Sequence, residues 1–233
     1  MNTFKKRISV ILPVKNGEKH LIEAIESVLT NINILDEIII INDGSTDQSK
    51  KIISKMSKKN IDMTIIDGEN LGPAEARNIG LKNAKGVYIA FIDHDDIWPS
   101  KRIERHFQIL KKNPDLHVVV GKTQYFSNII DALDNFNFKS LDKTIHHVHL
   151  GASTFKFDLF ELIGNFKSEL IFSEDHDLFL RMREQNISTY FDSEISLKYR
   201  IHETNMTKNK SLSELQLLNV LHKSILRRRK KSL

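Results

Sequence analysis

The sequence contains no cysteine among its 233 residues. A chain without thiols forms neither a disulfide framework nor a thiolate metal site. It also lacks any apolar run close to the roughly 20 residues that a membrane-spanning helix needs. The apolar stretch at residues 8–14 follows a short basic segment, but it is interrupted at Pro13 and is too short for a cleaved signal sequence. We therefore expect a cytoplasmic protein.

An excess of charge is missing from most of the chain. The net charge is +5, and residues 227–231 form an unbroken run of five arginines and lysines. Without that run the charges balance, so the body of the protein has no general polyanion-binding signature. We do not expect nucleic acid as a partner. No internal repeat or low-complexity linker interrupts the chain.

Segments typical of strands and helices alternate in the first half. The expected strands are residues 8–14, 37–41, 62–66 and 87–92. The expected helices are residues 17–30, a lysine-rich segment ending at 58, 73–84 and 99–111. Continuous apolar strands separated by helices predict a parallel sheet covered on both faces, and hence an α/β fold.

The second half is less regular. We expect, in order, a strand at 116–121, a polar excursion at 127–142, an extended segment at 146–157, a short helix at 158–163, a helix at 174–185, a strand at 195–202 and one helix from 211 onward. This pattern predicts one compact domain, residues 1–207, followed by a basic amphipathic helix at 208–233.

Three polar clusters follow predicted strands, at residues 15–18, 42–45 and 93–96. In open parallel sheets, ligands bind beyond the carboxyl ends of the strands, so these clusters should converge on one edge. The third cluster holds Asp93, Asp95 and Asp96, which repel one another unless a cation neutralises them. A divalent ion such as Mg²⁺ or Mn²⁺ would do so and could bridge to a diphosphate. Alternatively, these aspartates cap the following helix, a role that fits Asp96.

Other candidates have simple structural interpretations when each is taken alone. Asp43 could cap the helix that follows it, and Arg77 could be a solvated surface side chain. Glu174 and Asp175 could be an ordinary acidic first turn. His202, after a strand, could be structural.

Several ordered motifs nevertheless resemble the family 2 glycosyltransferases. They are ISVILPV at 8–14 with Asn16 and Glu18, IINDGSTD at 40–47, NLGP at 70–73 with ARN at 76–78, and AKG at 84–86 with FIDHDD at 91–96 and WP at 98–99. The resemblance extends from residue 8 to about 207. It implies the GT-A fold, a Rossmann-like and mostly parallel sheet flanked by helices, with a nucleotide-binding half at 1–112 and an acceptor half at 113–207. It also implies a nucleotide-diphosphate-sugar donor, a divalent metal (Mn²⁺ or Mg²⁺) and inversion at the anomeric carbon.

The same resemblance assigns the donor side of the site. Pro13 and Val14 should lie against the nucleoside, and Glu18 near the ribose. Asp43 resembles the aspartate that recognises the base, usually uracil, which favours a UDP-sugar. Asn70 and Arg77 resemble further nucleotide contacts.

The metal is assigned to the DxD-like motif. Asp93 and Asp95 match its two aspartates, with Asp95 the direct ligand, and His94 fills the variable middle position with a backbone contact only. His202, in the segment 199–207, resembles the histidine that completes the metal site.

The acceptor side follows from the second half. Asp175 resembles the general base of the family's ED motif, and Glu174 would help to hold the acceptor or the loop. A carboxylate at a helix start suits this base, because its direction is fixed. Gly151 resembles the glycine that lets the backbone approach the transferred sugar.

The resulting hypothesis is an inverting, metal-dependent glycosyltransferase that acts on a glycan or lipid-linked acceptor in surface polysaccharide synthesis. A nucleotidyltransferase is the nearest rival, but it would want a glycine-rich phosphate loop after the first strand, where this chain has only Gly17. A non-catalytic sugar-binding relative would not need both acidic motifs.

The tail allows two interpretations. Its apolar residues recur about one turn apart, at Leu215, Leu218, Leu221 and Ile225, and the basic run follows them. Such a helix could lie on an anionic membrane surface, peripheral to the inner face of the membrane. It could equally pack on the domain with a solvated basic end.

Overall fold

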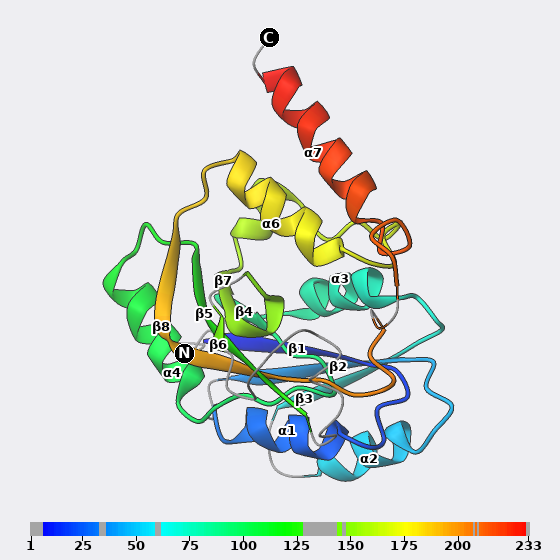
Figure 1. Cartoon of the computed structure of the whole chain (residues 1–233). Helices are drawn as coiled ribbons and strands as arrows, with labels where there is room; N and C mark the ends of the chain where they lie inside the picture. Colours follow the sequence, from blue (N-terminus) through cyan, green and yellow to red (C-terminus); the bar gives the residue numbers. More distant parts are fainter. Residues whose placement is uncertain are drawn as a thin grey trace.

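A mixed sheet forms the centre of the protein in a computed structural model, which describes residues 7–32, 36–58, 62–127, 144–145, 148–206, 208 and 210–231. Within these residues the sheet has eight strands. Figure 1 shows helices packed on both of its faces. The predicted α/β fold with covered faces is confirmed.

The first half supplies four parallel strands in the order β3-β2-β1-β4. Their bounds are β1 Ile8–Val14, β2 Glu37–Asp43, β3 Met63–Gly68 and β4 Tyr88–Phe91. The connecting helices are α1 Leu21–Leu29, α2 Ser49–Met56 and α3 Pro73–Asn83. Figure 1 places α1 and α2 on one face and α3 on the other. The strand order therefore reverses at β1, between β2 on one side and β4 on the other.

Burial on both faces explains the unbroken apolar strands. Ile38 to Ile41 of β2 are all fully buried. Successive side chains of a strand point to opposite faces. Ile39 and Ile41 accordingly join the core cluster beneath α3, whereas Ile38 and Ile40 join the cluster that includes residues of α1 and α2.

The second half completes the sheet and adds helices to both faces. Its elements are α4 Arg102–Lys112, β5 Val118–Phe126, β6 Thr144–Ile145, the 3₁₀ helix η3 Leu150–Ala152, β7 Ser153–Lys156, α5 Leu159–Ile163, α6 Glu174–Glu184, β8 Thr189–Arg200 and α7 Leu217–Lys231. Strand β7 runs antiparallel to both β4 and β5, and β8 runs parallel to β5. The sheet is thus parallel in its first half and mixed in its second.

Three helix starts differ from the predictions by three or more residues. Helix α4 begins at Arg102 rather than at residue 99. Helix α1 begins at Leu21 rather than at residue 17, because residues 17–20 form a turn closed by the His20 N–H on the Gly17 carbonyl at 3.0 Å. Helix α7 begins at Leu217 rather than at residue 211, because Gln216 adopts a left-handed φ of 57° that interrupts any continuous helix.

Other differences concern the second half. The segment expected to be extended contains η3, and β8 begins six residues before the predicted strand, at Thr189. The predicted polar excursion at 127–142 lies outside the described residues, apart from Ser127. No helix among the described residues has the length and apolar character required to cross a bilayer.

Close packing of α3 on β1 gives a test of the fold. A Cβ added at Gly80 would lie 2.4 Å from Cγ2 of Ile11. Gly80→Ala should lower the free energy of unfolding by about 1–3 kcal/mol, because overpacking a core outweighs the gain in helix propensity. Urea denaturation measures this change.

Lys82→Ala is the matched control, since Lys82 is exposed on the same helix and should change stability by no more than about 0.5 kcal/mol. A Gly80→Ala protein as stable as the wild type would contradict the close approach of α3 to β1.

Candidate active site

The predicted site lies where β1 and β4 separate. Their pairing ends at Ile11 and Phe91, and each chain continues beyond that point into polar residues. Pro13 still pairs with β2, and Val14 is buried at the strand end. In open α/β sheets this reversal of strand order creates the crevice in which ligands bind.

Asp43 ends β2, the neighbour of β1 in the sheet. Its two carboxylate oxygens accept hydrogen bonds from the N–H groups of Leu71 (2.6 Å) and Gly72 (2.9 Å), just before α3. The interpretation of Asp43 as a cap of α2, the helix that follows it, is therefore wrong. Asp43 binds the loop before α3 instead. Asn70, in the same loop, has a left-handed φ of 56° and lies against Gly44. Asp43 thus fixes the loop that carries Asn70.

Glu18, in the loop after β1, binds the loop that follows β2. Its carboxylate accepts the N–H of Gln48 at 3.0 Å, and its own N–H donates to Asp47 at 3.0 Å. The ring of His94 packs over Gly17, where an added Cβ would lie 2.6 Å from His94 Cδ2. These contacts join the loops after β1, β2 and β4.

Arg77 is a buried cation that pairs with two carboxylates of the site. It is 5% exposed, and its guanidinium donates to Asp93 at 2.8 Å and to Glu174. Burial acts to lower the pKa of Arg77, but the charges of Asp93, Glu174 and Asp175 outweigh burial and raise it. Arg77 is therefore not a solvated surface residue. It joins the acidic motif after β4 to the acidic start of α6.

Asp95 pairs with the predicted metal-site histidine. Its Oδ2 lies 2.8 Å from Nε2 of His202. Burial acts to raise the pKa of Asp95, but the hydrogen bond from His202 and the charges of His94 and His202 lower it. Residues 107 positions apart are thus brought into direct contact.

Asp96 has a different role from the helix cap expected for it. It is 1% exposed, and its Oδ1 accepts the backbone N–H of Arg200 at 2.9 Å, while α4 starts only at Arg102. Burial and the charges of Asp95 and Asp93 raise the pKa of Asp96 well above its usual range. Asp96 therefore anchors the end of β8, which places His202 beside Asp95.

The possible metal ligands form a pair rather than a cluster. Among the described residues, no three His, Asp or Glu side chains form a group that could hold a metal ion. Asp93, the third predicted ligand, is bound to Arg77. Asp95 and His202 offer oxygen and imidazole ligands of the kind that Mn²⁺ accepts, so this pair fits part of a metal shell.

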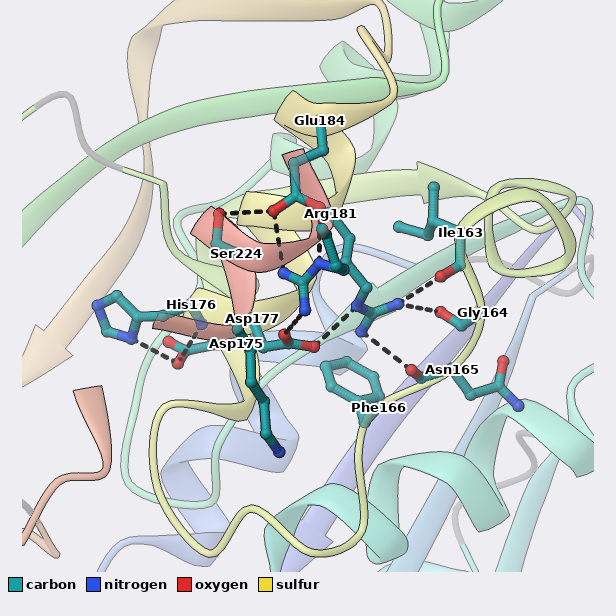
Figure 2. Close-up of polar contacts among 12 residues, drawn as sticks. Ile163, Gly164, Asn165, Phe166, Asp175, His176, Asp177, Arg181, Glu184 and Ser224 are labelled. Carbon is teal, nitrogen blue, oxygen red and sulfur yellow. Dashed lines mark hydrogen bonds and ion pairs between the residues drawn. The ribbon is translucent and has the colours of Figure 1, made fainter. Parts of the chain in front are cut away.

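Asp175 lies in the first turn of α6, after Ser173, which has a left-handed φ of 59°. Its Oδ1 accepts from the backbone N–H of His176 at 2.7 Å and lies 2.9 Å from Nδ1 of the same residue (Figure 2). Burial acts to raise the pKa of Asp175, but the hydrogen bonds and charge of His176 and the charge of His149 lower it. The carboxylate is therefore ionised at neutral pH, as a general base must be.

Gly151 has a packing role in η3. Its N–H donates to Nδ1 of His149 (3.1 Å), and its carbonyl accepts from Trp98 Nε1 (2.9 Å). An added Cβ would lie 3.0 Å from both methyl groups of Leu197. The contact between Gly151 and a sugar stays a prediction.

His149 was not predicted as part of the site. Its ring lies 5.4 Å from that of Tyr199, edge to face. Burial lowers the pKa of His149 against the charges of Asp93 and Asp175, which act to raise it. No motif in the sequence distinguishes it from His146 and His147, so only its folded position reveals it.

The buried charges around Arg77 yield a test by double-mutant cycle. Arg77→Gln should lower the free energy of unfolding by about 3 kcal/mol, because it leaves Glu174 buried without its partner. Glu174→Gln should cost less, since Arg77 keeps Asp93. Urea denaturation of the single and double variants would give a double-mutant loss smaller than the sum. Strictly additive losses would contradict a direct interaction between Arg77 and Glu174.

Comparison with known proteins identifies the family. The family model "Glycosyl transferase family 2" matches residues 9–164. An uncharacterised glycosyltransferase of Rickettsia typhi is 32% identical over 97% of this chain and 74% of its own length. The Escherichia coli protein WfgD, named a UDP-Glc:alpha-D-GlcNAc-diphosphoundecaprenol beta-1,3-glucosyltransferase, is 28% identical over 87% of this chain and 80% of its own length.

Among solved structures, Staphylococcus aureus TarS (residues 1–349) in complex with UDP-GlcNAc superposes with a TM-score of 0.77 at 18% identity. The match covers 94% of this chain and 66% of the TarS chain, so this chain spans about two thirds of that structure. The chain belongs to glycosyltransferase family 2 and has the GT-A fold.

Proposed function

We propose that the protein is an inverting glycosyltransferase that moves a sugar from a UDP-sugar to a hydroxyl of a glycan or lipid-linked acceptor. The observation that carries this proposal is the position of Arg77 between Asp93 and Glu174. It brings the carboxylates that follow β4 and those that begin α6 into one site. A transferase needs both, one set toward the leaving diphosphate and one toward the attacking hydroxyl.

The donor assignment rests on the crevice between β1 and β4. Pro13, Val14, Asp43 and Asn70 border the side proposed for the nucleoside, and Glu18 the ribose. Two similar proteins support uridine, since WfgD is named for UDP-Glc and TarS was solved with UDP-GlcNAc.

A divalent ion, Mn²⁺ or Mg²⁺, would be held by Asp95 and His202, with Asp93 nearby. Bound there, it would supply positive charge to the diphosphate as that group leaves. Asp95 is ionised, as a metal ligand must be, because the contact with His202 lowers its pKa. Arg77 adds a fixed positive charge that does not depend on the ion.

Asp175 would act as the general base. The acceptor hydroxyl attacks the anomeric carbon, its proton passes to the Asp175 carboxylate, and the bond from that carbon to the diphosphate oxygen breaks. Attack opposite the leaving group inverts the configuration. Glu174, held by Arg77, fixes the start of α6 and thus the direction of this carboxylate.

The acceptor proposal draws on WfgD, whose name specifies a sugar on diphosphoundecaprenol. A lipid-linked acceptor would place the protein at the inner face of a membrane, in surface polysaccharide synthesis. The nucleotidyltransferase alternative is disfavoured by the loop after β1, because its Gly17 lies against the His94 ring instead of being free to cradle a phosphate.

Replacement of the proposed base gives the sharpest test of the chemistry. Asp175→Asn should reduce transfer at least about 100-fold, because proton removal typically contributes 10²–10⁴-fold. UDP affinity, measured by calorimetry, should stay unchanged. His176→Gln is the matched control, since it removes the neighbouring contact but keeps the base, and its transfer should fall by less than about tenfold. Undiminished turnover in Asp175→Asn would reject the assignment.

The metal proposal predicts a specific loss of cation dependence. UDP should bind the wild type at least about tenfold more tightly with Mn²⁺ than without it. In Asp95→Asn that difference should disappear, because an amide is a poorer ligand than a carboxylate for this ion. Calorimetric titrations with and without Mn²⁺ measure both. Equal affinities in the wild type under the two conditions would count against a metal at this site.

A further inference from the structure

Helix α7 has two faces of different character. Val220 and Ser224 are 0% and 2% exposed and face the domain, where α7 packs on α6. Leu218, Leu221 and Ile225 are 57%, 42% and 41% exposed. We call these three residues the outer face of α7. The helix is thus packed on the domain, and yet its apolar stripe points away from it.

Exposed basic and apolar residues also lie near the two ends of α7. Arg228, Arg229 and Lys230 are exposed at the C-terminal end of the helix. Leu212 precedes the helix and is 58% exposed. Ile171, which is 57% exposed, binds Gln216 through its backbone N–H. Figure 1 shows α7 extending beyond α6, away from the sheet.

This combination matches the interface of an anionic bilayer. Apolar side chains enter the boundary between headgroups and acyl chains, and adjacent basic residues bind anionic lipid. A purely electrostatic partner such as a nucleic acid would gain nothing from exposed leucines and isoleucine. A surface that is apolar within and negatively charged outside would bind both the apolar and the basic residues.

The residues just before α7 bind the segment that leads into α6, the helix that carries the proposed base. The side-chain oxygen of Gln216 accepts the N–H groups of Ile171 (2.9 Å) and Phe172 (3.0 Å). The Leu215 carbonyl accepts from the Ser173 hydroxyl at 2.7 Å. Ser173 directly precedes Glu174 and Asp175. The start of α6 is therefore held by the residues that lead into α7.

A second set of contacts holds the rest of α6 (Figure 2). Ser224 donates to Glu184 at 2.6 Å, and Arg227 donates to Glu184 at 2.7 and 3.0 Å and to Asp177 at 3.1 Å. Asp177 is 1% exposed and lies two residues after Asp175. The side chains that fix α7 on the domain are thus separate from those of its outer face.

We propose that the outer face of α7 docks on an anionic lipid bilayer, and that the contacts of α7 with α6 hold the Asp175 end of α6 near the bilayer surface. The docking step stands on the surface of α7 alone. The placement of Asp175 rests on the proposed function, and it would bring the base to a hydroxyl that a lipid-linked acceptor presents at the membrane.

Vesicle flotation of the full chain tests the docking. The wild type should float with vesicles containing phosphatidylglycerol and much less with pure phosphatidylcholine, and salt should weaken binding. Two triple variants should each bind these vesicles at least about tenfold more weakly than the wild type. One is Leu218→Gln/Leu221→Gln/Ile225→Gln, and the other is Arg228→Gln/Arg229→Gln/Lys230→Gln. For the second variant, each basic residue near an anionic surface contributes about fivefold to binding. Leu162→Gln is the matched control, because Leu162 is 60% exposed on α5 and should leave binding unchanged.

Two further measurements separate docking from chemistry. Hydrolysis of a UDP-sugar without acceptor should be the same in the wild type and in both α7 variants, because the outer face touches no proposed site residue. Absence of this hydrolysis in the wild type would refute the proposed function while leaving the flotation result intact. Docking is refuted if the wild type does not float, or if both α7 variants float like the wild type. It is also refuted if light scattering shows a dimer of the wild type that the Leu218→Gln/Leu221→Gln/Ile225→Gln variant does not form.

Discussion

The candidate site depends on one buried cation, Arg77, held between carboxylates from distant parts of the chain. Asp93 follows β4 and Glu174 begins α6, and neither position is fixed by its own element alone. Burying a guanidinium is costly unless carboxylates pair with it in good geometry. The same ion pairs that offset this cost also set the distance between the two acidic motifs. Arg77 therefore contributes both to the stability of the fold and to the geometry of the site.

A second constraint comes from β8. Asp96 binds the backbone of Arg200, and the Arg200 guanidinium donates to the Asp95 carbonyl at 2.9 Å. These bonds hold the end of β8 against the acidic motif and bring His202 to Asp95. In the motif after β4, Asp93 thus binds Arg77, Asp95 binds His202, and Asp96 binds the end of β8. Three aspartates within four residues thus have three different partners.

Much of this arrangement could be predicted from the sequence. The parallel sheet of the first half follows from apolar runs such as residues 38–41, whose side chains are buried on both faces. Asp95 and His202 were assigned together by family resemblance, and the structure brings them into contact. Their metal role and the part played by Asp175 stay predictions, as does the division into donor and acceptor halves.

Other features could not be predicted, because they depend on contacts between distant residues. Periodicity in the tail gave no sign that Gln216 would leave the helix to bind Ile171 and Phe172, or that Val220 rather than Leu218 would face the domain. His149 carries no local signal, and Asp96 looked like a cap until its partner in β8 was known. A crystal structure with UDP and Mn²⁺ would test the proposed site most directly. We predict that the diphosphate lies between the ends of β1 and β4, with the ion on Asp95 and His202. UDP bound elsewhere, or no ligand between these strand ends, would contradict the proposed site.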